Sequence, residues 1–146
     1  MRLAINAAIK GIERGQTPFG ACIVKDRQVI VSTYNAVIAT IDITAHAEIQ
    51  AIRKACQFLG SVDLSGCEMY STSEPCPMCL MAAIWGKIDC IIYGTSSKDA
   101  QSVGFLGCSI PNNQMIQYSF RSIKLSGVFL LKECTELLTN LKQVVL

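Results

Sequence analysis

The feature that most constrains the fold of this chain is a regular alternation between strand-type and helix-type patterns of apolar residues. Helices are predicted at 2–15, 45–59, 77–85 and 129–144, and strands at 20–26, 28–35, 67–73, 87–94 and about 119–125. Asp42 or Thr44 is available to cap the second helix, and the stretch from 95 to about 117 is predicted to be irregular. The first two strands form a predicted hairpin, whereas the later strands are separated by helices. We therefore expect one α/β domain over residues 1–146, a three-layer α/β/α sandwich around a mixed, roughly five-stranded sheet.

Composition limits the partners and the compartment. Apolar residues make up 51% of the chain and charged residues 16%, so we expect apolar surface buried in a homo-oligomer, in the simplest case a homodimer. The formal charge is only +2, so nucleic acid is possible as a partner but is not favoured. The eight cysteines lie in apolar segments, as buried thiols do in a reducing compartment. With no export signal and no membrane span, the expected location is the cytoplasm.

A metal site is indicated by "SEPCPMC", residues 73–79, where a predicted strand ends and a helix begins. Pro75 and Pro77 favour a helix start because early helical positions need no amide hydrogen. Cys76 and Cys79 then lie on one helix face, at the spacing that lets two thiolates bind one zinc ion. By itself this pair could equally be two buried cysteines or a redox pair.

The only histidine of the chain, His46, also lies at a predicted helix start. Two helix starts that face each other across the end of a sheet would bring His46, Cys76 and Cys79 to one metal ion. Three protein ligands are typical of a catalytic zinc, whereas a structural zinc has four. Other cysteines could in principle close the site, but none has ligand spacing to the pair. We expect an open site with one Zn²⁺ per subunit.

Glu48 lies two residues after His46 and gains a role from the metal. Residues two apart in a regular helix point away from each other, so Glu48 is not expected to be a ligand. At the first turn its carboxylate can instead reach a water molecule beside the metal, take its proton and pass it on. Two thiolates cancel the charge of zinc, and we expect Glu48 and the two helix N-termini to compensate for the weaker Lewis acid.

These motifs resemble those of the zinc-dependent cytidine deaminase superfamily. "HAE" at 46–48 and "PCPMC" at 75–79 are similar to its His-x-Glu and Pro-Cys-x-x-Cys pattern. The resemblance extends through "TPFGACIVKD", "AHAEIQAIRKAC", "SEPCPMCLMAAIW" and "IIYGT", and is strongest to bacterial nucleoside and guanine deaminases and to tRNA adenosine deaminases. It implies a cytidine deaminase-like fold, zinc held by His46, Cys76 and Cys79, and proton transfer by Glu48.

The resemblance also implies a substrate pocket. Asn35 matches an asparagine that hydrogen-bonds the substrate, Phe19 matches a position that lines the base pocket, and the backbone of Ala45 and Ser73 matches positions that border the site. From the residues alone, Asn35 is equally well an ordinary turn residue, and Phe19 is more often simply core. Trp85 is expected to serve packing rather than the pocket.

Three functions follow from these observations. The favoured one is a hydrolytic deaminase that releases ammonia from a small nucleobase or nucleoside, with a purine such as guanine as the favoured substrate. The first alternative is a tRNA adenosine deaminase that forms inosine, and the second is a catalytically silent, zinc-stabilised interaction module. The chain reads "GFLG" at 104–107 where guanine deaminases typically have Gly-Phe-Asp-Asp, so the motifs predict the reaction more narrowly than the substrate.

Overall fold

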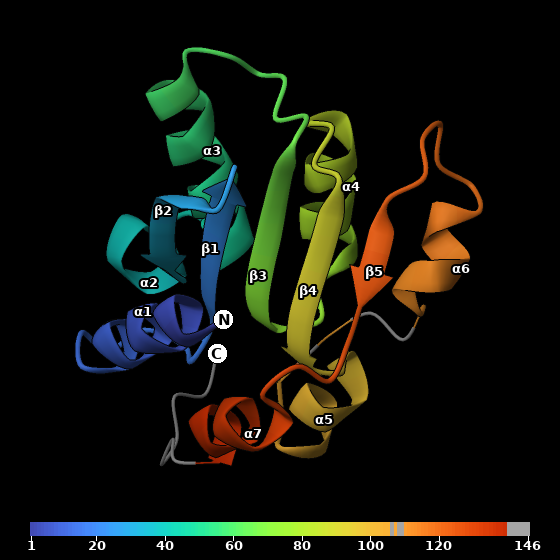
Figure 1. Cartoon of the computed structure of the whole chain (residues 1–146). Helices are drawn as coiled ribbons and strands as arrows, with labels where there is room; N and C mark the ends of the chain where they lie inside the picture. Colours follow the sequence, from blue (N-terminus) through green and yellow to red (C-terminus); the bar gives the residue numbers. More distant parts are fainter. Residues whose placement is uncertain (106, 108–109, 140–146) are drawn as a thin grey trace.

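The computed structural model describes residues 1–105, 107 and 110–139, which build a mixed sheet of five strands in the order β2-β1-β3-β4-β5 (Figure 1). The strands are β1 (Gly20–Lys25), β2 (Gln28–Tyr34), β3 (Cys67–Ser73), β4 (Cys90–Thr95) and β5 (Lys124–Ser126). β1 runs antiparallel to β2 and β3, whereas β3, β4 and β5 run parallel. The predicted mixed sheet is confirmed.

Helices cover both faces of the sheet and complete the three expected layers (Figure 1). α1 and α7 lie on one side, and α3 and α4 lie on the other. The helices are α1 (Arg2–Ile12), α2 (Val37–Thr40), α3 (Ala47–Leu59), α4 (Pro77–Trp85), α5 (Ser97–Ser102), α6 (Asn112–Ile116) and α7 (Leu131–Thr139). None of these described helices is long and apolar enough to cross a membrane.

The main core lies between the sheet and the α3–α4 layer. Ala47, Ala51 and Ala55 follow one another at four-residue spacing on α3 and are fully buried against the sheet. Their small side chains let the helix backbone approach the strands closely, so the start of α3 is held at a fixed distance from β3. A larger residue at Ala51 would overpack this layer and cost about 1–3 kcal/mol.

The structure differs from the sequence prediction in several places. α1 ends at Ile12 rather than near 15, β4 begins at Cys90 rather than at 87, and β5 spans Lys124–Ser126 rather than about 119–125. The segment after β4, predicted as irregular, contains the short helices α5 and α6. An extra short helix, α2, follows β2. The last helix begins at Leu131 rather than near Phe129, and the predicted continuation over 140–144 lies outside the described residues.

The start of α3 also differs from the prediction. Asp42 or Thr44 was the predicted cap, but Asp42 Oδ1 instead accepts hydrogen bonds from the backbone N–H and the hydroxyl of Thr44, at 2.8 and 2.6 Å. This local turn uses the side chains of Asp42 and Thr44 before the helix begins, so neither residue caps α3. His46 becomes the N-cap, with extended backbone and no side-chain capping bond, so its imidazole is left for other partners.

Candidate active site

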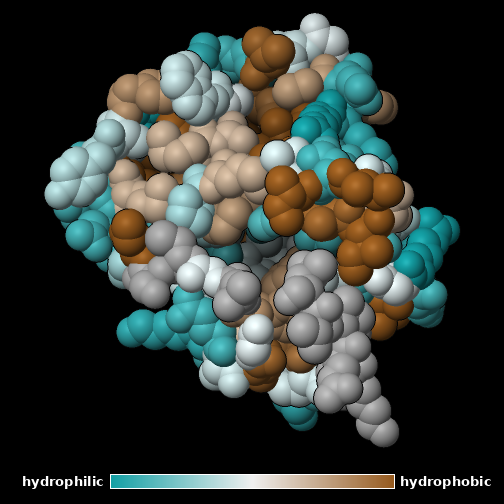
Figure 2. Space-filling model, turned by 180° about the vertical axis from the view of Figure 1, so that it is seen from behind, coloured by the Kyte–Doolittle hydropathy of each residue, from teal (hydrophilic) through white to brown (hydrophobic). Residues whose placement is uncertain are grey.

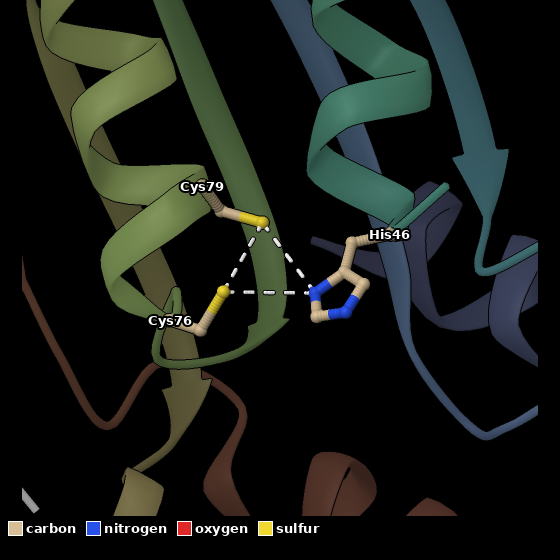
Figure 3. A group of neighbouring side chains, drawn as sticks. All are labelled: His46, Cys76 and Cys79. Atoms are coloured by element: carbon tan, nitrogen blue, oxygen red, sulfur yellow. Dashed lines mark hydrogen bonds between the residues drawn. The ribbon is translucent and has the colours of Figure 1, made fainter. Parts of the chain in front are cut away.

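Two helix starts meet at the metal-ligand motif. His46 is the N-cap of α3 and Cys76 the N-cap of α4, and both have extended backbone with no side-chain capping bond. Pro77 occupies the first turn of α4, and Cys79 lies one turn beyond Cys76. The three side chains point toward one another (Figure 3), with His46 Nδ1 3.6 Å from each sulfur and the two sulfurs 3.6 Å apart.

This triangle fits a tetrahedral zinc ion. Zinc–sulfur bonds of about 2.3 Å and zinc–nitrogen bonds of about 2.0 Å at tetrahedral angles separate ligand atoms by about 3.5 to 3.8 Å. Within the described residues, the group of possible ligands consists of His46, Cys76 and Cys79, without a fourth His, Cys, Asp or Glu. The structure thus brings the three predicted ligands together, and their thiolate and imidazole donors suit Zn²⁺.

The three donors differ in how readily they lose a proton. The hydrogen bond between the two sulfurs lowers the pKa of Cys76 to about 4, and His46 acts in the same direction. The hydrogen bond from Cys76 and burial raise the pKa of Cys79, while the bond to Cys76 raises the pKa of His46. A divalent cation that binds here would therefore displace protons from the donors.

Glu48 is a buried carboxyl group beside the triangle. It lies in the first turn of α3 and is only 6% exposed. Its Oε2 lies 3.6 Å from Cys79 Sγ, while its Oε1 accepts a hydrogen bond of 3.1 Å from the hydroxyl of Ser71. Burial raises the pKa of Glu48, so its carboxyl group holds a proton more readily than that of an exposed glutamate.

A cavity of about 560 Å³ opens onto this site. The expected site residues that line it are Phe19, Asn35, His46, Glu48, Ser73 and Cys76. Ala45 does not belong to the described lining: it is fully buried, its N–H donates to Asp42 and its carbonyl accepts from Ala36. Trp85 is 69% exposed and packs on Phe120, away from the cavity, as expected.

Asn35 is held in one orientation at the cavity wall. Its Oδ1 accepts a hydrogen bond of 3.1 Å from the backbone N–H of Val37, at the start of α2. Because the oxygen is fixed by a backbone donor, the amide NH₂ group is the end that a ligand in the cavity would meet. The residue is 5% exposed, so such a contact would be shielded from bulk water.

The structure adds cavity residues that sequence reasoning missed. Phe105 lines the cavity beside Phe19, with its ring edge-on to that of Phe19 at 4.9 Å between centroids. Thr17 also lines the cavity, and its buried hydroxyl has no hydrogen-bond partner within the described part of the chain. Glu74 lines it as well and binds Ser97 through both the backbone N–H and the hydroxyl. Of these residues, only Glu74 could have been noticed in the sequence, as the acidic residue within "SEPCPMC".

Known proteins carry the same arrangement. Residues 1–95 match the model of the cytidine and deoxycytidylate deaminase zinc-binding region. A guanine deaminase from Bacillus subtilis (strain 168) is 43% identical over 106 residues, which cover 72% of this chain and 68% of that protein. A tRNA-specific adenosine deaminase from Aquifex aeolicus is 40% identical over 98 residues, and the aligned region covers 67% of this chain and 65% of that protein.

A solved structure extends the similarity to nearly the whole chain. It comes from work on A-to-I editing by tRNA deaminases at the wobble position, and it superposes with a TM-score of 0.83 at 31% identity. The superposition covers 94% of this chain and 96% of that one. The similarity therefore includes the segments after β4 that wall the cavity.

Proposed function

Because the chain belongs to the cytidine and deoxycytidylate deaminase zinc-binding family, we propose that it is a hydrolytic deaminase of a nucleobase or nucleoside, with a purine such as guanine as the favoured substrate. The observation that carries this proposal is the position of Glu48, buried beside an open three-ligand site on the wall of a 560 Å³ cavity. A cavity of this size accepts a purine or a nucleoside. The guanine deaminase at 43% identity supports a purine.

His46, Cys76 and Cys79 would hold the zinc ion. Bound there, zinc would act as a Lewis acid that lowers the pKa of a water molecule toward neutrality. The N-termini of α3 and α4 both point at this place, and their dipoles favour negative charge on the sulfurs and on the attacking oxygen.

Glu48 moves the protons. Its Oε2 faces the metal side of the site, so it takes a proton from the attacking water and gives it to the ring nitrogen beside the reacting carbon. It then carries the second water proton to the exocyclic amine. A carbon–oxygen bond forms, the carbon–nitrogen bond breaks, and ammonia leaves.

The cavity wall orients the base. Asn35 donates from its amide NH₂ group to an acceptor on the heterocycle, Phe19 and Phe105 offer aromatic faces and edges to its ring, and the Ser73 region borders the reacting edge. Ala45 acts only through its backbone, by supporting the loop that leads to His46.

Deamination of adenosine in tRNA is the second candidate. The observation that favours it is the superposition with the tRNA-editing structure over 96% of that chain. Against it stands the charge of α7, where Lys132 is accompanied by Glu133 and Glu136. Binding to tRNA phosphates needs clustered positive charge and weakens steeply with salt.

We also propose a cytoplasmic homodimer built from the single domain over residues 1–146. Its contact face is an exposed apolar patch at the end of α4 and on the segments on either side of α6, made up of Trp85, Ile110, Tyr118 and Phe120. Figure 2 shows apolar residues at the surface on the side of α3 and α4. All cysteines that the structure describes are free, which supports a reducing compartment.

The test is a screen of zinc-loaded protein for ammonia release from guanine, adenine, cytosine and their nucleosides, in parallel with inosine formation in tRNA. Ammonia from a free base is expected in the wild-type protein and not in a Glu48→Ala variant. Glu68→Ala is the matched control, because Glu68 is an exposed glutamate on β3. Inosine in tRNA without ammonia from any free base would select the second candidate, and neither product would reject both.

A further inference from the structure

A hydroxyl interrupts the apolar face that β3 turns toward α3 and α4. Alternate residues of a strand share a face, and on β3 this face carries Cys67, Met69 and Ser71. Cys67 and Met69 are fully buried in the main core, and Ser71 is 2% exposed. A buried hydroxyl in an apolar row is costly unless it is hydrogen-bonded, so its partner indicates why it is there.

The partner of Ser71 is the carboxyl group of Glu48. Ser71 Oγ donates a hydrogen bond of 3.1 Å to Glu48 Oε1 across the interface between β3 and α3, and both side chains are buried. A hydroxyl donor to a buried carboxyl group restricts the side-chain rotation of that group. The two oxygens of Glu48 are therefore not equivalent.

We propose that Ser71 is a positioning residue for Glu48: it holds Oε1 against β3, so that Oε2, which lies 3.6 Å from Cys79 Sγ, is the oxygen that exchanges protons at the reacting centre. This role rests on the proposed deaminase function. Ser71 does not line the cavity, so it acts through Glu48 and not on the substrate. Without it, the carboxyl group can rotate and present either oxygen, and a misplacement of about 1 Å can cost about a hundredfold in rate.

Thr33 provides a matched comparison within the same layer. Its hydroxyl is also buried and donates a hydrogen bond of 2.7 Å to the carbonyl oxygen of Ala47, the residue before Glu48. Thr33 and Ser71 thus fasten the same turn of α3 from two strands, but only Ser71 reaches the carboxyl group. A loss of packing or helix anchoring should appear in both variants, whereas a loss of carboxyl orientation should appear only in the Ser71 variant.

The experiment compares kcat, KM, zinc content and melting temperature for Ser71→Ala, Ser71→Thr and Thr33→Val. Ser71→Ala should lower kcat about tenfold or more with little change in KM or zinc content. Ser71→Thr keeps a hydroxyl and should recover most of the lost kcat. Thr33→Val should lower the melting temperature and leave kcat near that of the wild type. Ser71→Cys, close to serine in size, replaces Ser71→Ala if the alanine variant does not fold.

A double-mutant cycle separates orientation from a general structural effect. In a Glu48→Ala background, Ser71→Ala should cause no further loss of the residual single-turnover rate, because the group that it positions is absent. An equal loss in both backgrounds, or an unchanged kcat for Ser71→Ala alone, would overturn the proposal.

Crystal structures of the zinc-loaded proteins give a readout that does not need activity. The Glu48 carboxyl group should keep its Oε2 on the metal side in wild type and rotate or become disordered in Ser71→Ala. An unchanged carboxyl position in the variant would overturn the positioning role. If the wild-type protein releases no ammonia and forms no inosine, the deaminase function fails, and this comparison still decides whether Ser71 orients Glu48.

Discussion

Glu74 Oε2 accepts two hydrogen bonds from Ser97, one from its backbone N–H at 3.0 Å and one from its hydroxyl at 2.8 Å. Its Oε1 accepts a longer bond of 3.4 Å from the N–H of Asn112 at the start of α6, and the Asn112 amide donates to the carbonyl of Pro75 at 3.0 Å. The chain between β3 and Cys76 therefore ties the first residues of α5 and α6 to the metal loop.

Replacing Glu74 by alanine should loosen the cavity wall. The N–H and hydroxyl of Ser97 lose a charged acceptor, and such bonds contribute about 1.5–3 kcal/mol each. We expect KM for the base to rise about tenfold and the melting temperature to fall, with zinc content unchanged. Steady-state kinetics and metal analysis check this, with Glu68→Ala as the surface control. An unchanged KM would show that Glu74 does not shape the cavity.

Replacing Glu48 by glutamine should abolish turnover without loss of the metal. Glutamine has nearly the same shape but cannot carry a proton, and general acid–base catalysis is worth about 10²- to 10⁴-fold in rate. The expected result is a fall in kcat of that size with one zinc ion per chain retained, measured by ammonia release and atomic emission. Turnover at the wild-type rate in the zinc-loaded variant would remove Glu48 from the mechanism.

Replacing Cys76 by serine should reduce the zinc content below one ion per chain. Cys76 supplies one of the three described donors, and a neutral hydroxyl is a poor substitute for a thiolate. The variant should also melt at a lower temperature, because metal bound to the folded chain stabilises it. Cys90→Ser is the control, since Cys90 lies on β4 outside the group of ligands. Equal zinc content in the two variants would contradict the ligand assignment.

The Cys134 thiol should make the protein less stable in alkali. Burial raises the pKa of Cys134 to about 11, and Glu133 acts in the same direction. In the unfolded chain a thiol loses its proton at about pH 8.5, so between about pH 8.5 and pH 11 the folded state binds more protons. Stability therefore falls as pH rises through this window. Denaturant titrations should give a shallower fall for Cys134→Ala, and an identical slope would exclude Cys134 as the cause.

The exposed aromatic pair on α4 and beyond α6 offers a test of the dimer. Trp85 and Phe120 pack on each other with 4.8 Å between ring centroids while remaining 69% and 63% exposed. Phe120→Asp places a charge in this patch and should yield a monomer in analytical ultracentrifugation, whereas Phe58→Asp, at another exposed phenylalanine, should not. A dimer that survives Phe120→Asp would place the subunit contact elsewhere.

Local sequence patterns were sufficient to predict the metal ligands and most of the helices and strands. Cys76 and Cys79 lie in one helical turn, and together with His46 at a second helix start their spacing predicts a shared ion. Asp42 and Thr44 were misjudged as caps because either an Asx turn or a helix cap suits such residues, and tertiary contacts decide between them.

Contacts between segments that lie far apart in the sequence could not be predicted from local patterns. Ser71 and Glu48 lie 23 residues apart, as do Glu74 and Ser97, and only the packing of β3 against its neighbours brings each pair together. Polar residues in a strand give no sign of which partner they meet. The sequence therefore located the chemistry but not the groups that orient it or close the cavity.

The hydrogen bonds of Glu74 join two parts of the chain that have different roles. The metal ligands and Glu48 lie within the 1–95 region that matches the family model, whereas α5, Phe105 and the start of α6 come from the last third. These later segments meet the metal loop through Glu74 and Pro75. A change in the last third can therefore reshape one part of the cavity wall while the predicted metal ligands and Glu48 keep their places. Chimaeras joined just after β4 are the natural way to retarget this enzyme.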